Sequence, residues 1–119
     1  MKTQIKATNI KLTSNISNHL DKKLAALEKL IDPKDTSVLC SVEVEKTSER
    51  HKRGELFRSE IKLHIAGATF YAEATEENLF DAIDETKAQM TKEITRYKDK
   101  KSKSVRKGGA KMKAILRNE

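Results

Sequence analysis

The hydrophobic period of this chain changes twice along its length, and this change constrains the fold more than any other feature. Residues 38 to 74 alternate apolar and polar side chains, as in Val38, Cys40, Val42 and Val44. A period of two is typical of strands with one buried face. The segments before and after it place apolar residues three or four apart, as amphipathic helices do. The sequence therefore predicts strands enclosed between two helices.

The first helix is predicted from one apolar stripe, which contains Ile16, Leu20, Leu24, Leu27 and Ile31. Thr13 or Ser14 can cap its start, because a hydroxyl oxygen accepts a hydrogen bond from a first-turn amide. The helix should end near Asp32 and Pro33, since the residue before a proline avoids helical geometry. Residues 2 to 7 alternate weakly before this helix, and we expect them to form an edge strand.

The later part of the chain predicts three strands and a long helix. The strands cover residues 38 to 45, 57 to 65 and 70 to 74, with a loop over 46 to 54 and a tight turn at Ala66-Gly67. Thr75 is the expected N-cap of the second helix, which should run from about residue 76 to 100. Its apolar stripe comprises Leu79, Ile83, Thr86, Met90, Ile94 and Tyr97.

These elements predict an α+β fold in the order β-α-β-β-β-α. Two helices with one apolar stripe each can cover one face of a four-stranded mixed sheet. The first helix would form a right-handed crossover between two parallel strands. We expect one domain over residues 1 to 101, followed by a basic, flexible and disordered tail over residues 102 to 119, which contains Gly108-Gly109.

The charge of the chain is concentrated at its C-terminal end. Residues 1 to 91 contain 14 Lys and Arg against 15 Asp and Glu, whereas residues 92 to 119 contain 11 against 3. This asymmetry favours a polyanionic partner, most often nucleic acid, over a solvated tail. One cysteine excludes an internal disulfide, and the sequence has no apolar run that could serve as a secretory signal or membrane span. We therefore expect a cytoplasmic protein that does not bind a membrane.

The candidate binding residues are basic side chains on the two predicted helices. Lys92, Arg96 and Lys100 recur every four residues and so share one face of the second helix, and Lys98, Lys101 and Lys103 widen that face. Favourable contacts with the helix dipole explain one or two of these cations but not the whole run. A smaller group on the first helix consists of Lys22, Lys23 and Lys29. Arg50, Lys52 and Arg53 could form a basic finger in the loop or a solvated hairpin tip.

Catalytic chemistry has little support in the sequence. His19, His51 and His64 are not at metal-ligand spacing from one another or from a cysteine, and Cys40 fits a buried, inert thiol. The carboxylates at Asp81, Asp84 and Glu85 fit the positive end of a helix dipole. We expect no enzyme activity, cofactor, metal or small-molecule substrate.

Several segments resemble a known family when taken together. They are Leu12-Thr-Ser-Asn-Ile16, Lys23-Leu-Ala-Ala-Leu-Glu-Lys29, Asn78-Leu-Phe-Asp-Ala-Ile-Asp84 and Arg96-Tyr-Lys-Asp-Lys100. With the order of elements, they resemble the bacterial ribosome hibernation-promoting factors and ribosome-associated inhibitors over residues 2 to 101. The resemblance implies a protein that binds rRNA of the small ribosomal subunit at the decoding channel. There it would compete with tRNA and mRNA and inhibit translation sterically in stationary phase or stress.

The resemblance also implies which residues contact rRNA. The basic family positions match Lys23 and Lys29 on the first helix and Lys92, Arg96, Lys98 and Lys100 on the second, while Ala26 stands where the family commonly has Lys. The length fits the short form of the family, and the basic tail leaves the effect on ribosome dimerisation open. The alternative hypothesis is a general binder of double-stranded RNA or DNA.

Overall fold

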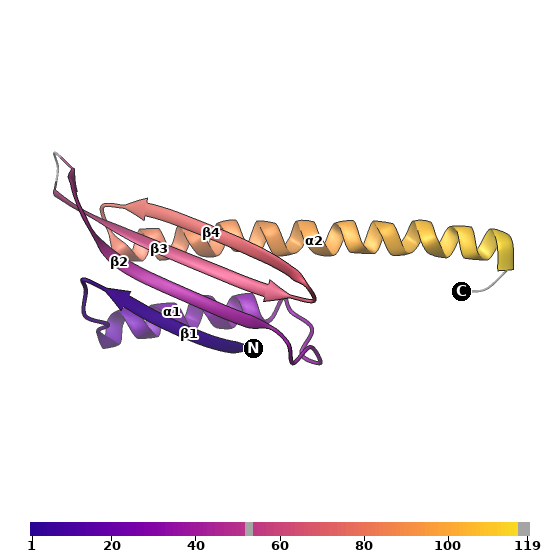
Figure 1. Cartoon of the computed structure of the whole chain (residues 1–119), viewed down its shortest axis with the longest axis horizontal. Coiled ribbons are helices and arrows are strands. Elements are labelled where there is room, and N and C mark those ends of the chain that lie inside the picture. Colours follow the sequence, from indigo (N-terminus) through magenta and orange to yellow (C-terminus); the bar gives the residue numbers. More distant parts are fainter. Residues whose placement is uncertain (52–53, 117–119) are drawn as a thin grey trace.

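The computed structural model describes residues 1–51 and 54–116, and it describes the side chains of residues 1–47 and 54–100. The elements follow the predicted order (Figure 1). They are β1 (Lys2–Thr8), α1 (Ser14–Glu28), β2 (Leu39–His51), β3 (Gly54–Ile65), β4 (Ala68–Glu76) and α2 (Leu79–Leu116).

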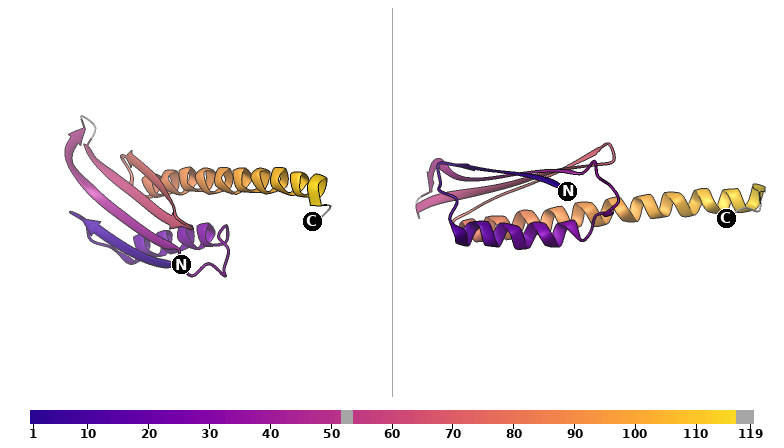
Figure 2. Two further views of the ribbon diagram at one scale, coloured as in Figure 1. Left: turned by 45° about the vertical axis from the view of Figure 1, so that its right-hand side comes forward. Right: turned by 90° about the horizontal axis from the view of Figure 1, so that it is seen from below.

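The four strands form one mixed sheet in the order β1-β2-β3-β4. β1 pairs with β2 in parallel, and the β2–β3 and β3–β4 pairs are antiparallel. Both helices lie on the same side of this sheet, and the other side is left open (Figure 2). The predicted α+β class, with two helices covering one face, is confirmed.

The core lies between the sheet and the helices, where the two hydrophobic periods meet. α1 contributes Leu20 and Leu27, and α2 contributes Ile83 and Met90, each at most 1% exposed. Burying a side chain of this size contributes about 2 kcal/mol. Val38, which directly precedes β2, and the inward residues of β2 and β3 add to this core; the strand residues are Cys40, Val42, Val44, Ile61, Leu63 and Ile65.

One buried polar contact fixes α2 on the sheet. The Thr86 hydroxyl donates to the Ile83 carbonyl (2.8 Å), and its oxygen lies 3.1 Å from the Ser59 hydroxyl of β3. Because the Thr86 proton is already used, Ser59 is the donor in the second bond. Both hydroxyls are therefore satisfied although they are fully buried.

The helix caps agree with the prediction at α1 and differ at α2. Thr13 caps α1, since its hydroxyl accepts from the amide of Ile16 at 3.3 Å. The prediction that Thr75 caps α2 is wrong, because Thr75 pairs with Arg58 as part of β4. Asn78 takes this role, and its side chain accepts from the amide of Phe80 at 2.8 Å.

The loop expected over residues 46 to 54 is also corrected. β2 and β3 continue through most of it, and the pairing of Arg50 with Glu55 and of His51 with Gly54 extends the hairpin. The register shifts between Lys46 and Arg50, where the strands are irregular. Pairing of the two backbones outweighs the polar composition on which the loop prediction rested.

The second helix extends past the end predicted near Lys100. α2 has 38 residues, or about 57 Å at the usual helical rise, and it projects beyond the sheet in Figure 1. The backbone of residues 102 to 116 continues α2, and the flexibility and disorder expected of this basic tail stay predictions. Lys, Arg, Ala, Met and Leu in this segment favour helix, and they offset a cost of about 1 kcal/mol for each of Gly108 and Gly109. The division of the chain into a domain and a tail at residue 101 stays a prediction.

Candidate nucleic-acid interface

The exposed sides of α1 and α2 present five cations, and we call this surface the helix face. It consists of Lys22 on α1, Lys29 at the C-cap of α1, and Lys92, Arg96 and Lys100 on α2, all of them exposed. Among the side chains that the structure describes, the four lysines form no salt bridge. Arg96 is 66% exposed and has one neighbour, Glu93, at 3.6 Å. The helix face therefore presents largely unneutralised positive charge.

Two of the predicted contact residues have intramolecular partners instead. The Nζ of Lys23 lies 3.3 Å from Oδ1 of Asp84 on α2, and only 31% of the Lys23 side chain is exposed. The Nζ of Lys98 donates to the carbonyl oxygen of Leu30, just after α1, at 2.8 Å. Each of these lysines thus bridges the two helices, although Lys98 remains largely exposed.

Asp84 is the centre of one of these bridges. Its Oδ1 also accepts a hydrogen bond from Nε2 of His19 at 2.7 Å, and the His19 ring packs edge-on against Phe80 with centroids 5.0 Å apart. Burial alone would raise the pKa of Asp84, but the hydrogen bonds from His19 and Lys23 outweigh it and lower this pKa below its ordinary value. Asp84 is therefore held as a carboxylate between α1 and α2.

The open side of the sheet, which we call the sheet face, has side chains of both charges, and its carboxylates gather around one arginine. Arg58 lies at its centre and forms salt bridges with four carboxylates, at 2.6 Å to Glu60, 3.1 Å to Glu73, 3.4 Å to Glu43 and 3.5 Å to Glu45. These four glutamates come from β2, β3 and β4, so three strands meet at one guanidinium. The centre of the sheet face has an excess of negative charge.

Hydrogen bonds around Arg58 favour the ionised forms of the carboxylates. The Thr8 hydroxyl donates to Glu43 at 2.7 Å and lowers the pKa of that group, with Lys6 and Arg58 adding to the effect. Arg58 and Tyr71 both donate to Glu73, whose pKa is lowered in turn. The same Glu73 bond raises the pKa of Tyr71. Tyr71, an exposed aromatic of β4, is thus tied into this network.

The described part of the β2–β3 hairpin, which reaches His51 and Gly54, ends at the opposite end of the molecule from the C-terminal part of α2 (Figures 1 and 2). The backbone of Arg50 belongs to β2, while Lys52 and Arg53 lie outside the described residues. The side chains of Lys101 and Lys103 lie outside the described part as well, although their backbone continues α2.

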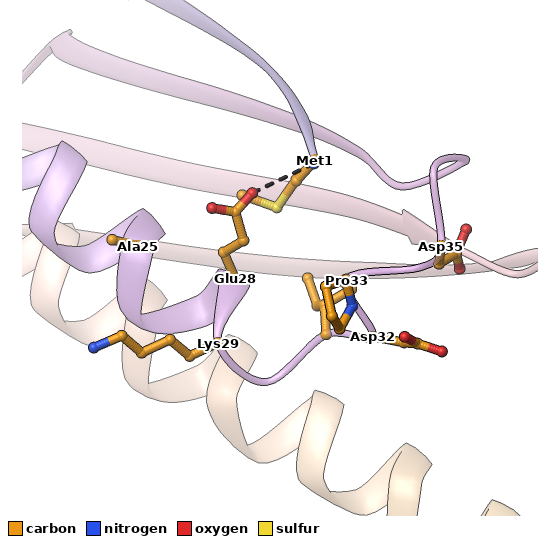
Figure 3. A pocket seen from close by; sticks show the side chains of 8 residues that line it. Met1, Ala25, Glu28, Lys29, Asp32, Pro33 and Asp35 are labelled. Carbon is orange, nitrogen blue, oxygen red and sulfur yellow. Dashed lines mark ion pairs between the residues drawn. The ribbon is translucent and has the colours of Figure 1, made fainter.

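A shallow hollow of about 390 Å³ lies between the start of β1 and the end of α1 (Figure 3). The N-terminal ammonium of Met1 pairs there with Glu28 at 3.3 Å, and the Lys29 side chain points away from that ion pair. The carboxylate of Glu28 is therefore engaged in holding the chain terminus, and Lys29 stays on the helix face.

Among the residues considered for catalysis, the surroundings of Cys40 and His64 are described. Cys40 is 2% exposed, and burial raises its pKa to about 11, which disfavours the thiolate. His64 donates or accepts a bond with Thr69 at 3.0 Å. Among the side chains of residues 1–47 and 54–100, no three His, Cys, Asp or Glu gather as a metal site would require. None of the helices in residues 1–51 and 54–116 is long and apolar enough to cross a membrane.

The sequence pointed to the cations of the helix face but not to the partners of Lys23 and Lys98. Asp84 lies 61 positions after Lys23, and Leu30 lies 68 positions before Lys98. From the sequence, the helix dipole alone explains the carboxylates at the start of α2. Only the parallel packing of the two helices shows that Asp84, one of these carboxylates, bridges them.

Comparison with known proteins agrees with this architecture. A family model described as "Sigma 54 modulation protein / S30EA ribosomal protein" matches residues 3–102. A search among curated proteins finds no match. Among solved structures, the N-terminal domain of Protein Y from Thermus thermophilus is 21% identical, with a TM-score of 0.66 over 82% of this chain and 99% of that one. A ribosomal subunit interface protein from Coxiella burnetii is 14% identical, with a TM-score of 0.66 over 83% and 99%.

At these identities the two structures establish the fold, and the family match covers most of the sequence. The matched residues include the whole of α1 and the part of α2 that ends at residue 102. The chain therefore belongs to the sigma 54 modulation protein / S30EA ribosomal protein family.

Proposed function

We propose that this protein is a ribosome hibernation factor that binds the small ribosomal subunit at the channel for tRNA and mRNA. It would contact rRNA phosphates through the helix face and inhibit translation sterically during stationary phase or stress. No bond is made or broken in this action, so it needs neither a catalytic residue nor a cofactor. Family membership supports association with the ribosome, and the Coxiella burnetii neighbour is itself described as a ribosomal subunit interface protein.

The observation that carries the proposal is the contrast in charge between the two sides of the molecule. The helix face presents Lys22, Lys29, Lys92, Arg96 and Lys100 to solvent. The centre of the sheet face presents four carboxylates around one guanidinium. A polyanion such as rRNA is attracted to the first surface and repelled by the second, so this polarity favours one orientation during binding.

Contacts with phosphates fit the chemistry of the helix face better than reading of bases. Lysine and arginine contacts to phosphate position a protein on nucleic acid without specifying a base. The outward aromatic of the sheet, Tyr71, is bonded to Glu73 and Arg58. A stacked base there would lie over carboxylates. We therefore expect recognition of the shape and the backbone of a folded rRNA site.

Sedimentation with purified ribosomal subunits tests the proposal. The protein should sediment with the small subunit, and saturating amounts of tRNA together with mRNA should displace it. Sedimentation with the large subunit alone, or binding that tRNA and mRNA leave unchanged, would overturn the proposed site.

A parallel measurement with naked RNA and DNA duplexes separates the proposal from general duplex binding, which the sequence left as an alternative. A hibernation factor should prefer the small subunit to a duplex of random sequence at the same ionic strength. Equal affinity for the two would favour the alternative.

A further inference from the structure

α1 and α2 are joined by polar bridges near both ends of their contact. Asp84, in the second turn of α2, binds His19 and Lys23 in the middle of α1. Lys98, about 21 Å further along α2, binds the Leu30 carbonyl just beyond the end of α1. The order of these contacts shows that the helices run parallel, as Figure 1 also shows.

The two helices also pack directly against each other, and their buried side chains belong to one core with the sheet. Apolar packing is non-directional, so it defines the lateral position of α1 against α2 less closely than directional bonds do. Besides the two bridges, Phe80 packs edge-on against His19. The two bridges add directional contacts that fix the lateral position of α1 against α2 near both ends of this packing. This position also sets the spacing between the cations of α1 and those of α2.

We propose that Asp84 and Lys98 are positioning residues that hold α1 and α2 at the spacing at which the helix face meets rRNA. Lys23, on this view, acts through Asp84 and makes no phosphate contact of its own. The inference rests on the proposed function, and it adds which residues of that surface contact rRNA and which ones hold the two helices in place. The three lysines of α1 thus separate into two for rRNA contact, Lys22 and Lys29, and one for the bridge.

Removing the Asp84 charge distinguishes positioning from simple electrostatics, because the two predict changes of opposite sign. Asp84→Asn makes the protein more positive, so charge alone predicts tighter binding to rRNA. Loss of a positioning residue predicts weaker binding, by roughly three- to tenfold, because the spacing must be restored on binding. Asp84 is 47% exposed, so the substitution leaves the core intact.

Asp81→Asn is the matched control. Asp81 lies one turn earlier on α2, is exposed, and forms no ion pair among the described side chains. The Asp81→Asn variant has the same change of charge as Asp84→Asn, and it should bind as tightly as the parent protein or slightly more tightly. Asp84→Glu, which keeps a carboxylate on the same side of α2, should recover part of the lost affinity.

The salt dependence of binding tests the role of each lysine. Neutralising a cation that contacts phosphate lowers the slope of log affinity against log salt by about one unit. Lys23→Gln and Lys98→Gln should weaken binding without this change of slope, whereas Lys29→Gln and Lys100→Gln should show it. A reduced slope for Lys23→Gln or Lys98→Gln would identify that residue as a phosphate contact and overturn its positioning role.

A distance measurement in the free protein makes the test independent of ribosome binding. Spin labels attached at Asn18→Cys on α1 and Ala88→Cys on α2 report the spacing of the helices, and Cys40 is too buried to take a label. The distance distribution should broaden in the Asp84→Asn background and stay narrow with Asp81→Asn. An unchanged distribution, or binding by Asp84→Asn as tight as that of Asp81→Asn, would overturn the inference. Absence of small-subunit binding by the parent protein would instead overturn the proposed function, whatever the spin labels report.

Discussion

The two sides of this molecule are both rich in charge, but they use it differently. On the sheet face, four glutamates from three strands are paired with the one guanidinium of Arg58. On the helix face, four of the five cations form no ion pair with a described carboxylate, and Arg96 has Glu93 as its neighbour. Charges that pair within a fold stabilise it modestly, whereas charges left unpaired repel one another until a partner neutralises them. The difference supports our proposal that the helix face is the surface for an anionic partner.

Reversing charge on the helix face should have the largest effect. Lys92→Glu with Arg96→Glu replaces two attractions by two repulsions, and each lost charge-assisted bond costs about 1.5–3 kcal/mol. We expect affinity for the small subunit to fall by roughly 100-fold or more. Both side chains are exposed, so thermal unfolding should be little changed. Binding is measured by co-sedimentation or by fluorescence anisotropy with a labelled protein.

The control makes the same change of charge on the sheet face. Lys6→Glu with Lys62→Glu reverses two exposed cations there. This variant should bind almost as well as the parent protein. If the two double variants lose affinity equally, the effect comes from net charge and the contrast between the surfaces has no functional meaning.

Raising the salt concentration should produce the second-largest effect. Five phosphate contacts, one for each cation of the helix face, predict that affinity falls roughly 100- to 500-fold between 50 and 200 mM monovalent salt, taking the slopes for single strands and for duplex DNA as limits. Affinity measured over this range gives the slope directly. A slope near zero would mean that apolar or neutral polar contacts dominate the interface.

Shortening the chain should have an intermediate effect. A protein that ends at Lys101 lacks six Lys and Arg, and we expect its affinity to fall by roughly tenfold because the removed charges attract rRNA at long range. A second variant that keeps the length but replaces these six residues with Gln separates charge from contact area. Unchanged affinity of the shortened protein would show that residues 102 to 119 have no part in binding.

Removing Arg58 should affect stability and leave binding nearly unchanged. The network lowers the pKa of Glu43 and Glu73, so it stabilises the folded protein above the ordinary carboxylate pKa, and this contribution is lost as pH falls through the lowered values. Arg58→Met should cost about 1–2 kcal/mol at pH 7. Urea unfolding should show that the free energies of unfolding of the parent protein and of Arg58→Met differ less near pH 3.5 than at neutral pH. A difference that stays constant between the two pH values would contradict the proposed role of the charges.

The fold could be predicted from the sequence because its signals are local. Alternation such as Ile61, Leu63 and Ile65 on β3 gives the face of a strand, and the stripe from Leu79 to Ile94 gives the face of α2. The predictions were wrong where strand pairing outweighed the local signals of a cap or of a polar loop. Thr75 resembles a cap but joins β4, and the polar residues up to His51 continue β2.

The candidate site was predictable only in part, for a different physical reason. Exposed cations such as Lys92 and Arg96 follow from helical periodicity, since they fall outside the apolar stripe. Whether a lysine is free depends on residues that are distant in the sequence. The bonds of Lys23 to Asp84 and of Lys98 to Leu30 form only after both helices dock on the sheet.

A structure of the protein bound to the small ribosomal subunit tests the central claim most directly. The account predicts that Lys22, Lys29, Lys92, Arg96 and Lys100 lie within hydrogen-bonding distance of rRNA phosphates, and that the carboxylates around Arg58 point away from RNA. A complex in which the sheet face lies against rRNA while these five cations face solvent would contradict it.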